Sequence, residues 1–123
     1  MSIVRFLPLL MLAVPVALAA QSMPVSTFLA KADALQKKGP MALFSGDMKL
    51  LQAQLKNSGK ALRAEQNADA KAGRKASLCM PPKASVNSTA LLTYLKTVPV
   101  AQRSMPFGQA FRGFIQRKYP CPA

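Results

Sequence analysis

The sequence contains no histidine and no tryptophan, and only four of its 123 residues are acidic. The lack of histidine excludes a Ser-His or Cys-His nucleophile pair and an imidazole proton shuttle. A zinc site wants several Cys or His ligands, and two cysteines are all that the chain offers. It also lacks a phosphate-binding loop and a dinucleotide fingerprint. We therefore expect a protein that is not an enzyme and that needs no metal or cofactor.

The four acids are Asp33, Asp47, Glu65 and Asp69. In number they would suffice for the carboxylate pair of a glycoside hydrolase. However, none of these acids lies in a recognisable catalytic motif. Asp47, Glu65 and Asp69 are spaced like solvated residues of a helix. We expect these carboxylates to lie on the surface.

The first 19 residues have the organisation of a secretory signal peptide. Arg5 supplies one positive charge, the run 6–18 is apolar and uncharged, and Ala17-Leu18-Ala19 has the small-x-small pattern of a signal-peptidase site. A membrane span needs about 20 apolar residues, whereas this run is shorter and contains two prolines. The sequence predicts a periplasmic or secreted protein that is cleaved after Ala19, with Ala20 as the alternative.

The chain has two cysteines, Cys79 and Cys121, one near each end of the stretch 77–121. Two cysteines in a small exported chain are more often paired than free. Two buried thiols are the alternative. We predict a disulfide that closes this stretch.

Residues 20–123 are long enough for a single domain, and their many Ala, Leu, Lys and Gln residues favour helix. No stretch sustains the alternation of β-branched and polar residues that predicts a strand. We expect an all-α fold, a small assembly of four helices with one disulfide tying the ends of a C-terminal helical hairpin. Caps and breakers place the helices at about 27–38 (capped by Ser26 or Thr27), 46–72, 88–98 (capped by Asn87 or Ser88) and 107–118, with one apolar turn at 41–44.

Apolar residues at helical spacing mark the side of each helix that should be buried. They are Met48, Leu51, Leu55 and Leu62 in the long helix; Leu91, Leu92 and Leu95 in the third; and Phe107, Ala110, Phe111, Phe114 and Ile115 in the fourth. Past Leu62 the apolar side of the long helix consists of alanines, so residues 65–75 are expected to fray or to project. Asn57-Ser58-Gly59 is a point where this helix could bend or break.

Positive charge gathers on one side of the long helix. The members of this basic strip are Lys49, Lys56, Lys60, Arg63, Lys71 and Arg74. The whole chain has a formal net charge of +13, which becomes +12 once Arg5 is removed with the signal peptide. Such a strip is ordinarily the solvated back of an amphipathic helix. The alternative is that it attracts an anionic partner.

Outside the cytoplasm, that partner would be a wall polymer, lipid headgroups or an acidic protein surface. The signal peptide disfavours nucleic acid. Membrane-surface binding usually places Trp or Phe beside the cations, and the apolar side of this helix holds Met and Leu that the core needs. A protein or a wall polymer is therefore the preferred partner.

Three short motifs in the C-terminal third, Cys79-Met80-Pro81, Leu91-Leu92-Thr93-Tyr94-Leu95 leading to Pro99, and Tyr119-Pro120-Cys121, resemble a known pattern. It is the C-terminal pattern of the Rap/Tai family, exported immunity proteins against type VI secretion amidase effectors. The resemblance implies a small α-helical periplasmic protein, often a homodimer, that occludes the active site of a peptidoglycan-cleaving amidase. It also implies that Cys79 and Cys121 are bonded and that Leu91, Leu92, Leu95 and Pro99 belong to a packed hairpin.

The resemblance assigns no inhibitory residue, and the region 21–75 departs from the family pattern, above all in its long basic helix. Two functions are therefore expected. The first is an exported binding protein that blocks a peptidoglycan amidase by steric occlusion. The alternative is an envelope-associated module that holds anionic wall or lipid polymer through the basic helix.

Overall fold

The computed structural model describes residues 22–122, which fold into four α-helices and two short 3-10 segments without a strand. The helices are α2 (Val25–Lys38), α3 (Gly46–Lys71), α4 (Ser88–Lys96) and α5 (Phe107–Lys118), and the 3-10 segments are η1 (Gly39–Phe44) and η2 (Val100–Gln102). The predicted all-α, four-helix architecture is confirmed. The predicted signal peptide, residues 1–19, lies outside the described residues.

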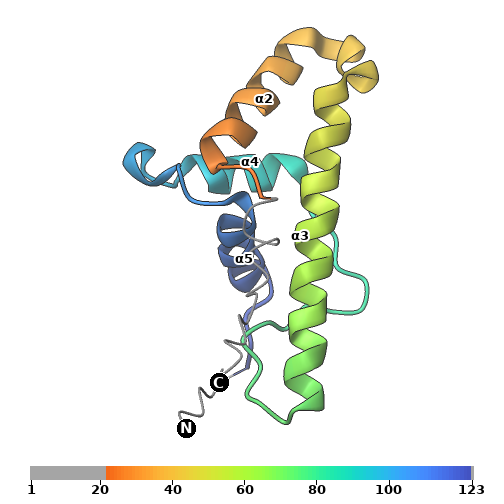
Figure 1. The fold of residues 1–123 in the computed structure, drawn as a ribbon, viewed down its shortest axis with the longest axis vertical. Helices are drawn as coiled ribbons and strands as arrows, with labels where there is room; N and C mark the ends of the chain where they lie inside the picture. The colour runs from red at the N-terminus through yellow and green to blue at the C-terminus, as the bar shows by residue number, and fades with distance from the viewer. Residues whose placement is uncertain (1–21, 123) are drawn as a thin grey trace, which may run out of the picture.

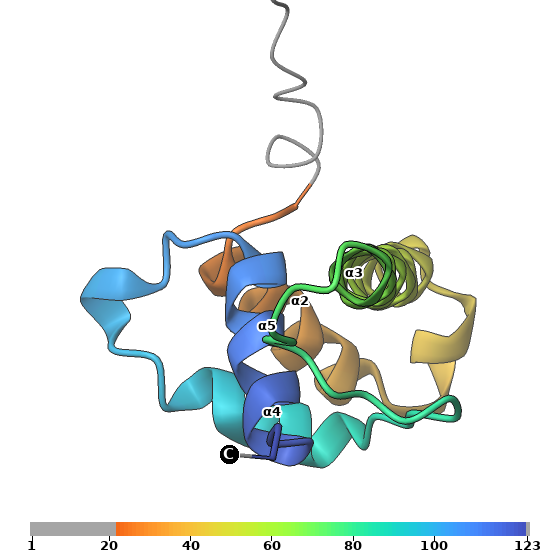
Figure 2. The ribbon, with the colours of Figure 1, turned by 90° about the horizontal axis from the view of Figure 1, so that it is seen from below.

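The long helix α3 defines the long axis of the molecule (Figure 1). α2 leans against its first half, and η1 joins the two helices at the upper end. α5 packs beside α3 further down, and α4 crosses α2 and α5 (Figure 2). Among the described residues, no helix is long and apolar enough to cross a membrane.

The core is built around the aromatic residues of α5. The rings of Phe28 and Phe107 stack with their centroids 4.3 Å apart, and the rings of Phe107 and Phe111 stack at 5.6 Å. All five residues of the predicted apolar side of α5 are buried. In α4, Leu91 and Leu95 are buried and Leu92 is partly buried. The apolar spacing therefore identified the buried sides of both helices.

The start of α2 differs from the prediction. The helix begins at Val25, and neither Ser26 nor Thr27 is its N-cap. Instead, the amide nitrogens of Val25 and Ser26 donate hydrogen bonds to the carbonyl oxygens of Met105 (3.0 Å) and Arg103 (2.9 Å). The first turn of a helix has unpaired N–H groups, and here a distant segment supplies the acceptors that a capping side chain would otherwise provide. The predicted cap was wrong for this reason.

The predicted disulfide between Cys79 and Cys121 is present, with the two Cα atoms 5.2 Å apart. It joins the loop after α3 to the segment after α5, so it closes the C-terminal hairpin. The residues on either side of Cys79, Leu78 and Met80, are buried in the core. The sequence predicted only a loop here, but this loop fills part of the core beneath the disulfide.

α3 passes through Asn57-Ser58-Gly59 without interruption and stays helical to Lys71 rather than fraying. Beyond Leu62, polar contacts take over from apolar packing. The side chain of Gln66 accepts a hydrogen bond from the amide nitrogen of Met80 (2.9 Å) and donates one to its carbonyl oxygen (3.0 Å). This pair ties the second half of α3 to the disulfide loop.

Candidate functional site: the lysine face of the long helix

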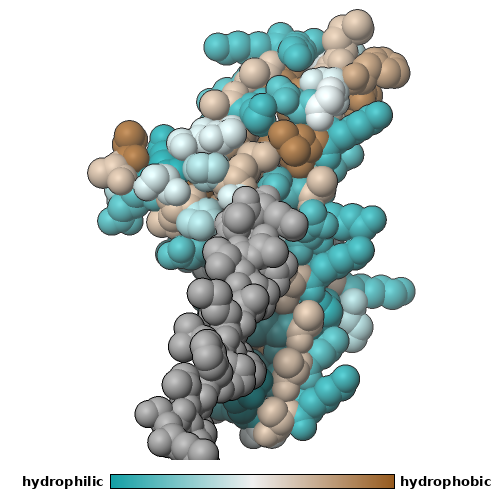
Figure 3. Space-filling view, in the orientation of Figure 1, coloured by the Kyte–Doolittle hydropathy of each residue, from teal (hydrophilic) through white to brown (hydrophobic). Residues whose placement is uncertain are grey.

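The structure divides the six cations of the basic strip into two groups. Lys49, Lys56, Lys60 and Lys71 are exposed, and their side chains make no hydrogen bond or ion pair with any described residue. We call these four residues the lysine face. Figure 3 shows hydrophilic side chains that project in a row along the outer edge of α3. The face extends over most of a helix of 26 residues, or about 39 Å at 1.5 Å per residue.

Arg63 belongs to the second group because it has a structural role. Its guanidinium donates hydrogen bonds to the carbonyl oxygens of Met80 (3.1 Å) and Pro81 (2.7 Å). Together with Gln66, it fixes the backbone on the C-terminal side of Cys79. Arg63 is therefore occupied within the protein and is not available to a partner in this conformation.

Arg74 also has an internal partner. Gly73, with φ of 66°, adopts a left-handed conformation after the end of α3 and turns the chain back. The side chain of Arg74 then forms an ion pair with Asp69 at 3.0 Å. The sequence did not predict this pair, because helical spacing does not describe the turn after the helix.

Three of the four acids are ion-paired. Besides Asp69, Asp47 pairs with Lys31 of α2 at 3.0 Å, and Glu65 pairs with Arg112 of α5. The negative charge of each of these carboxylates is therefore compensated by a neighbouring cation. No such neighbour compensates the lysine face within residues 22–122, so the outer side of α3 presents uncompensated positive charge along much of its length.

We expect Arg63→Ala to lower the free energy of unfolding by about 1.5–3 kcal/mol, because charge-assisted hydrogen bonds to two carbonyl groups are lost. Thermal unfolding of the purified protein measures this change. Lys60→Ala is the matched control on the same helix, since its side chain is exposed and contacts nothing in the described chain. Equal melting temperatures for the two variants would contradict the structural role of Arg63.

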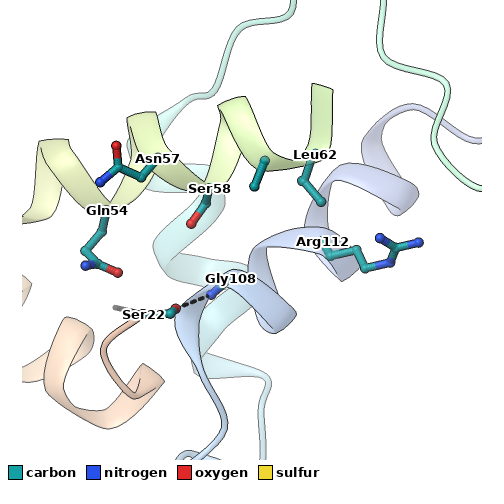
Figure 4. Close-up of a pocket in the computed structure, with 8 residues that line it drawn as sticks. Ser22, Gln54, Asn57, Ser58, Leu62, Gly108 and Arg112 are labelled. Atoms are coloured by element: carbon teal, nitrogen blue, oxygen red, sulfur yellow. Dashed lines mark hydrogen bonds between the residues drawn. The ribbon is translucent and has the colours of Figure 1, made fainter. Parts of the chain in front are cut away.

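A concavity of about 260 Å³ lies between α3 and α5 (Figure 4). Gln54 and Ser58 project into it from α3, and Arg112 points away toward Glu65. The hydroxyl oxygen of Ser22 accepts a hydrogen bond from the amide nitrogen of Gly108 at 2.9 Å. These polar groups mainly hold the first described residues against the two helices. We therefore interpret the concavity as part of the packing between these segments and not as a binding site.

A second hollow, of about 460 Å³, opens between α2, α3 and α4. Its walls are core side chains, among them Phe28, Leu35, Leu51 and Leu91, and Gln36 and Gln52 lie among them as polar residues. The sequence did not predict this groove, because the apolar residues of α3 and α4 that line it were assigned to the packed interior. An apolar side chain of a partner is the kind of group that such a groove accepts.

η1 is a further surface that sequence reasoning did not assign. The sequence predicted a helical turn at 41–44 with Pro40 in its first position, and the structure confirms that turn as a 3-10 segment. Its large apolar side chains are nevertheless exposed to solvent. The sequence does carry a signal for this exposed segment. Gly-Pro before it and Ser-Gly after it end one helix and begin the next, so the segment is continuous with neither helix.

Comparison of the chain with protein-family models, with curated proteins and with solved structures found no match.

Proposed function

We propose that this is an exported, non-enzymatic binding protein that inhibits a peptidoglycan-cleaving amidase by covering its active site. The lysine face carries the proposal, because it is an extended positive surface that residues 22–122 leave uncovered. The C-terminal resemblance to the Rap/Tai family supplies the class of partner. Export, which the first 19 residues predict, would bring the protein to the compartment where such amidases act.

The residues that carry the resemblance support a scaffold role. Cys79 and Cys121 are bonded, and Leu91 and Leu95 are among the most deeply buried side chains. The loop that contains Cys79 is in turn fixed to α3 by Arg63 and Gln66. The C-terminal hairpin thus holds the inner side of a long, straight helix and leaves its outer side free for a partner.

The charge of the lysine face matters mainly for the rate at which a partner associates. Long-range attraction between complementary surfaces raises association rates by roughly 10- to 1,000-fold, and salt screens this effect. An inhibitor of a toxin that arrives in the periplasm benefits from fast capture. The partner surface is expected to be acidic around the opening of its active site.

The test is survival of cells that export a type VI amidase effector into their own periplasm. Co-export of this protein is expected to prevent lysis, and Lys56→Glu with Lys60→Glu is expected to remove most of the protection. Lys83→Glu with Lys96→Glu is the matched control, because both lysines are exposed on other elements and the net charge changes equally. Lysis in the presence of the wild-type protein, with every amidase tested, would overturn the proposed function.

A further inference from the structure

The η1 segment forms an exposed apolar tip made of Met41, Leu43 and Phe44. The exposed fractions of their side chains are 69%, 70% and 83%, which are very high for large apolar residues that follow one another in the chain. Ala42, between them, is buried in the core and anchors the segment. Because Ala42 faces the core, the large side chains on either side of it point toward solvent.

The backbone of the tip is fixed at both ends. Gly39 has φ of 59°, a left-handed conformation that favours glycine, and the ring of Pro40 fixes its own φ near the start of η1. At the other end, the amide nitrogen of Ser45 donates to the carbonyl oxygen of Ala42 at 3.0 Å. The side chains are thus presented on a defined turn between α2 and α3.

Lysines flank the apolar tip along the chain on both sides. Lys37 and Lys38 occupy the last turn of α2, and Lys49 lies near the start of α3. All three are exposed. Asp47, the acid nearest to the tip along the chain, is already paired with Lys31, and Asp33, four residues before Lys37 on α2, forms no ion pair within the described residues. Within the described residues, the apolar tip is thus flanked by lysines that form no ion pair. This combination complements a partner with an apolar interior and a negatively charged surface layer.

We propose that the apolar tip inserts into the headgroup region of an anionic lipid bilayer, with Lys37, Lys38 and Lys49 against the lipid phosphates. The shape favours a bilayer over a protein groove, since the tip is convex and lies at the extreme upper end of the molecule (Figures 1 and 3). Buried apolar area and attraction of lysines to anionic lipids together determine the strength of such binding. Membrane-surface binding usually places Trp or Phe beside the cations, and here that aromatic residue is Phe44 on η1, not a residue of α3.

This surface shares only Lys49 with the lysine face, and the proposal does not depend on the proposed function. The apolar tip lies at one end of α3, while the disulfide loop packs on its second half. A protein held by the tip would present most of the lysine face away from the bilayer, along a helix of about 39 Å.

The chain has no tryptophan, so Phe44→Trp introduces a single reporter at the apolar tip. We expect the emission of this variant of the mature protein to shift to shorter wavelength with vesicles that contain phosphatidylglycerol. The shift should be absent with pure phosphatidylcholine vesicles and should weaken as salt is added. Val100→Trp is the matched control, because Val100 is 77% exposed on η2, away from the tip, and no shift is expected there.

A second pair of variants measures the contribution of the apolar side chains without a probe. Leu43→Ser with Phe44→Ser is expected to weaken co-sedimentation with the phosphatidylglycerol vesicles at least about tenfold. Val86→Ser with Val100→Ser, which also removes two exposed apolar side chains, should leave it unchanged. Equal vesicle binding by the two variants would overturn the proposal. So would a Phe44→Trp shift that appears with a purified amidase and not with vesicles, because the tip would then be a protein contact.

Discussion

Replacing Cys79 and Cys121 together by serine is expected to lower the free energy of unfolding by about 4 kcal/mol. The disulfide closes a loop with a sequence separation of 42 residues, and its loss returns the corresponding chain entropy to the unfolded state. A domain of this size has a total stability of roughly 5–15 kcal/mol, so the loss is a large share. The melting temperature should fall by roughly 15–30 °C.

Thermal unfolding followed by circular dichroism, with and without a reducing agent, measures this effect. Reduction should lower the melting temperature of the wild-type protein toward that of the double-serine variant and leave the variant unchanged. A fall of only a few degrees would mean that the hairpin is held by Leu78, Met80 and the bonds from Arg63 and Gln66 without help from the disulfide.

Phe107→Ala is expected to lower the free energy of unfolding by about 3–5 kcal/mol. The side chain has no exposed surface and stacks with the rings of Phe28 and Phe111, so its removal leaves a cavity where α2 meets α5. Phe107→Leu keeps most of the volume and should cost less than half as much. Urea unfolding should show a lower midpoint with little change in slope.

The backbone at Phe107 sharpens this expectation, because its amide nitrogen donates a 2.7 Å hydrogen bond to the carbonyl oxygen of Met23. The alanine variant keeps that bond, so the measured loss reports the side chain. If Phe107→Ala and Phe107→Leu had equal midpoints, close to that of the wild-type protein, the aromatic stack would not be the centre of the core.

The fold was largely predictable because its helices carry local signals. Regular apolar spacing marks the buried side of α5, Asn87 caps α4 by accepting from the amide nitrogen of Ala90 at 3.0 Å, and Gly73 ends α3. Each of these features depends on residues a few positions apart. The disulfide needed only the inference that the protein is exported, since the chain allows one pairing.

The features that escaped prediction depend on residues that are distant in sequence. The free N–H groups at the start of α2 donate hydrogen bonds to carbonyl groups near residue 105. Arg63 donates hydrogen bonds to the backbone of the disulfide loop. Helical projection could place Arg63 on the basic side of α3 but could not show that it has an internal partner. The exposure of Phe44 was equally hidden, because a short apolar run ordinarily indicates burial.

The association rate of the purified mature protein with an amidase effector, measured at low and at high salt, tests the central claim most directly. For the wild-type protein, the rate constant should fall as salt is added. Lys56→Glu with Lys60→Glu should lower it about tenfold or more at low salt and flatten its salt dependence. The Lys83→Glu and Lys96→Glu control should behave like the wild-type protein. Identical rates for the two double variants at every salt concentration would show that the lysine face is only solvated.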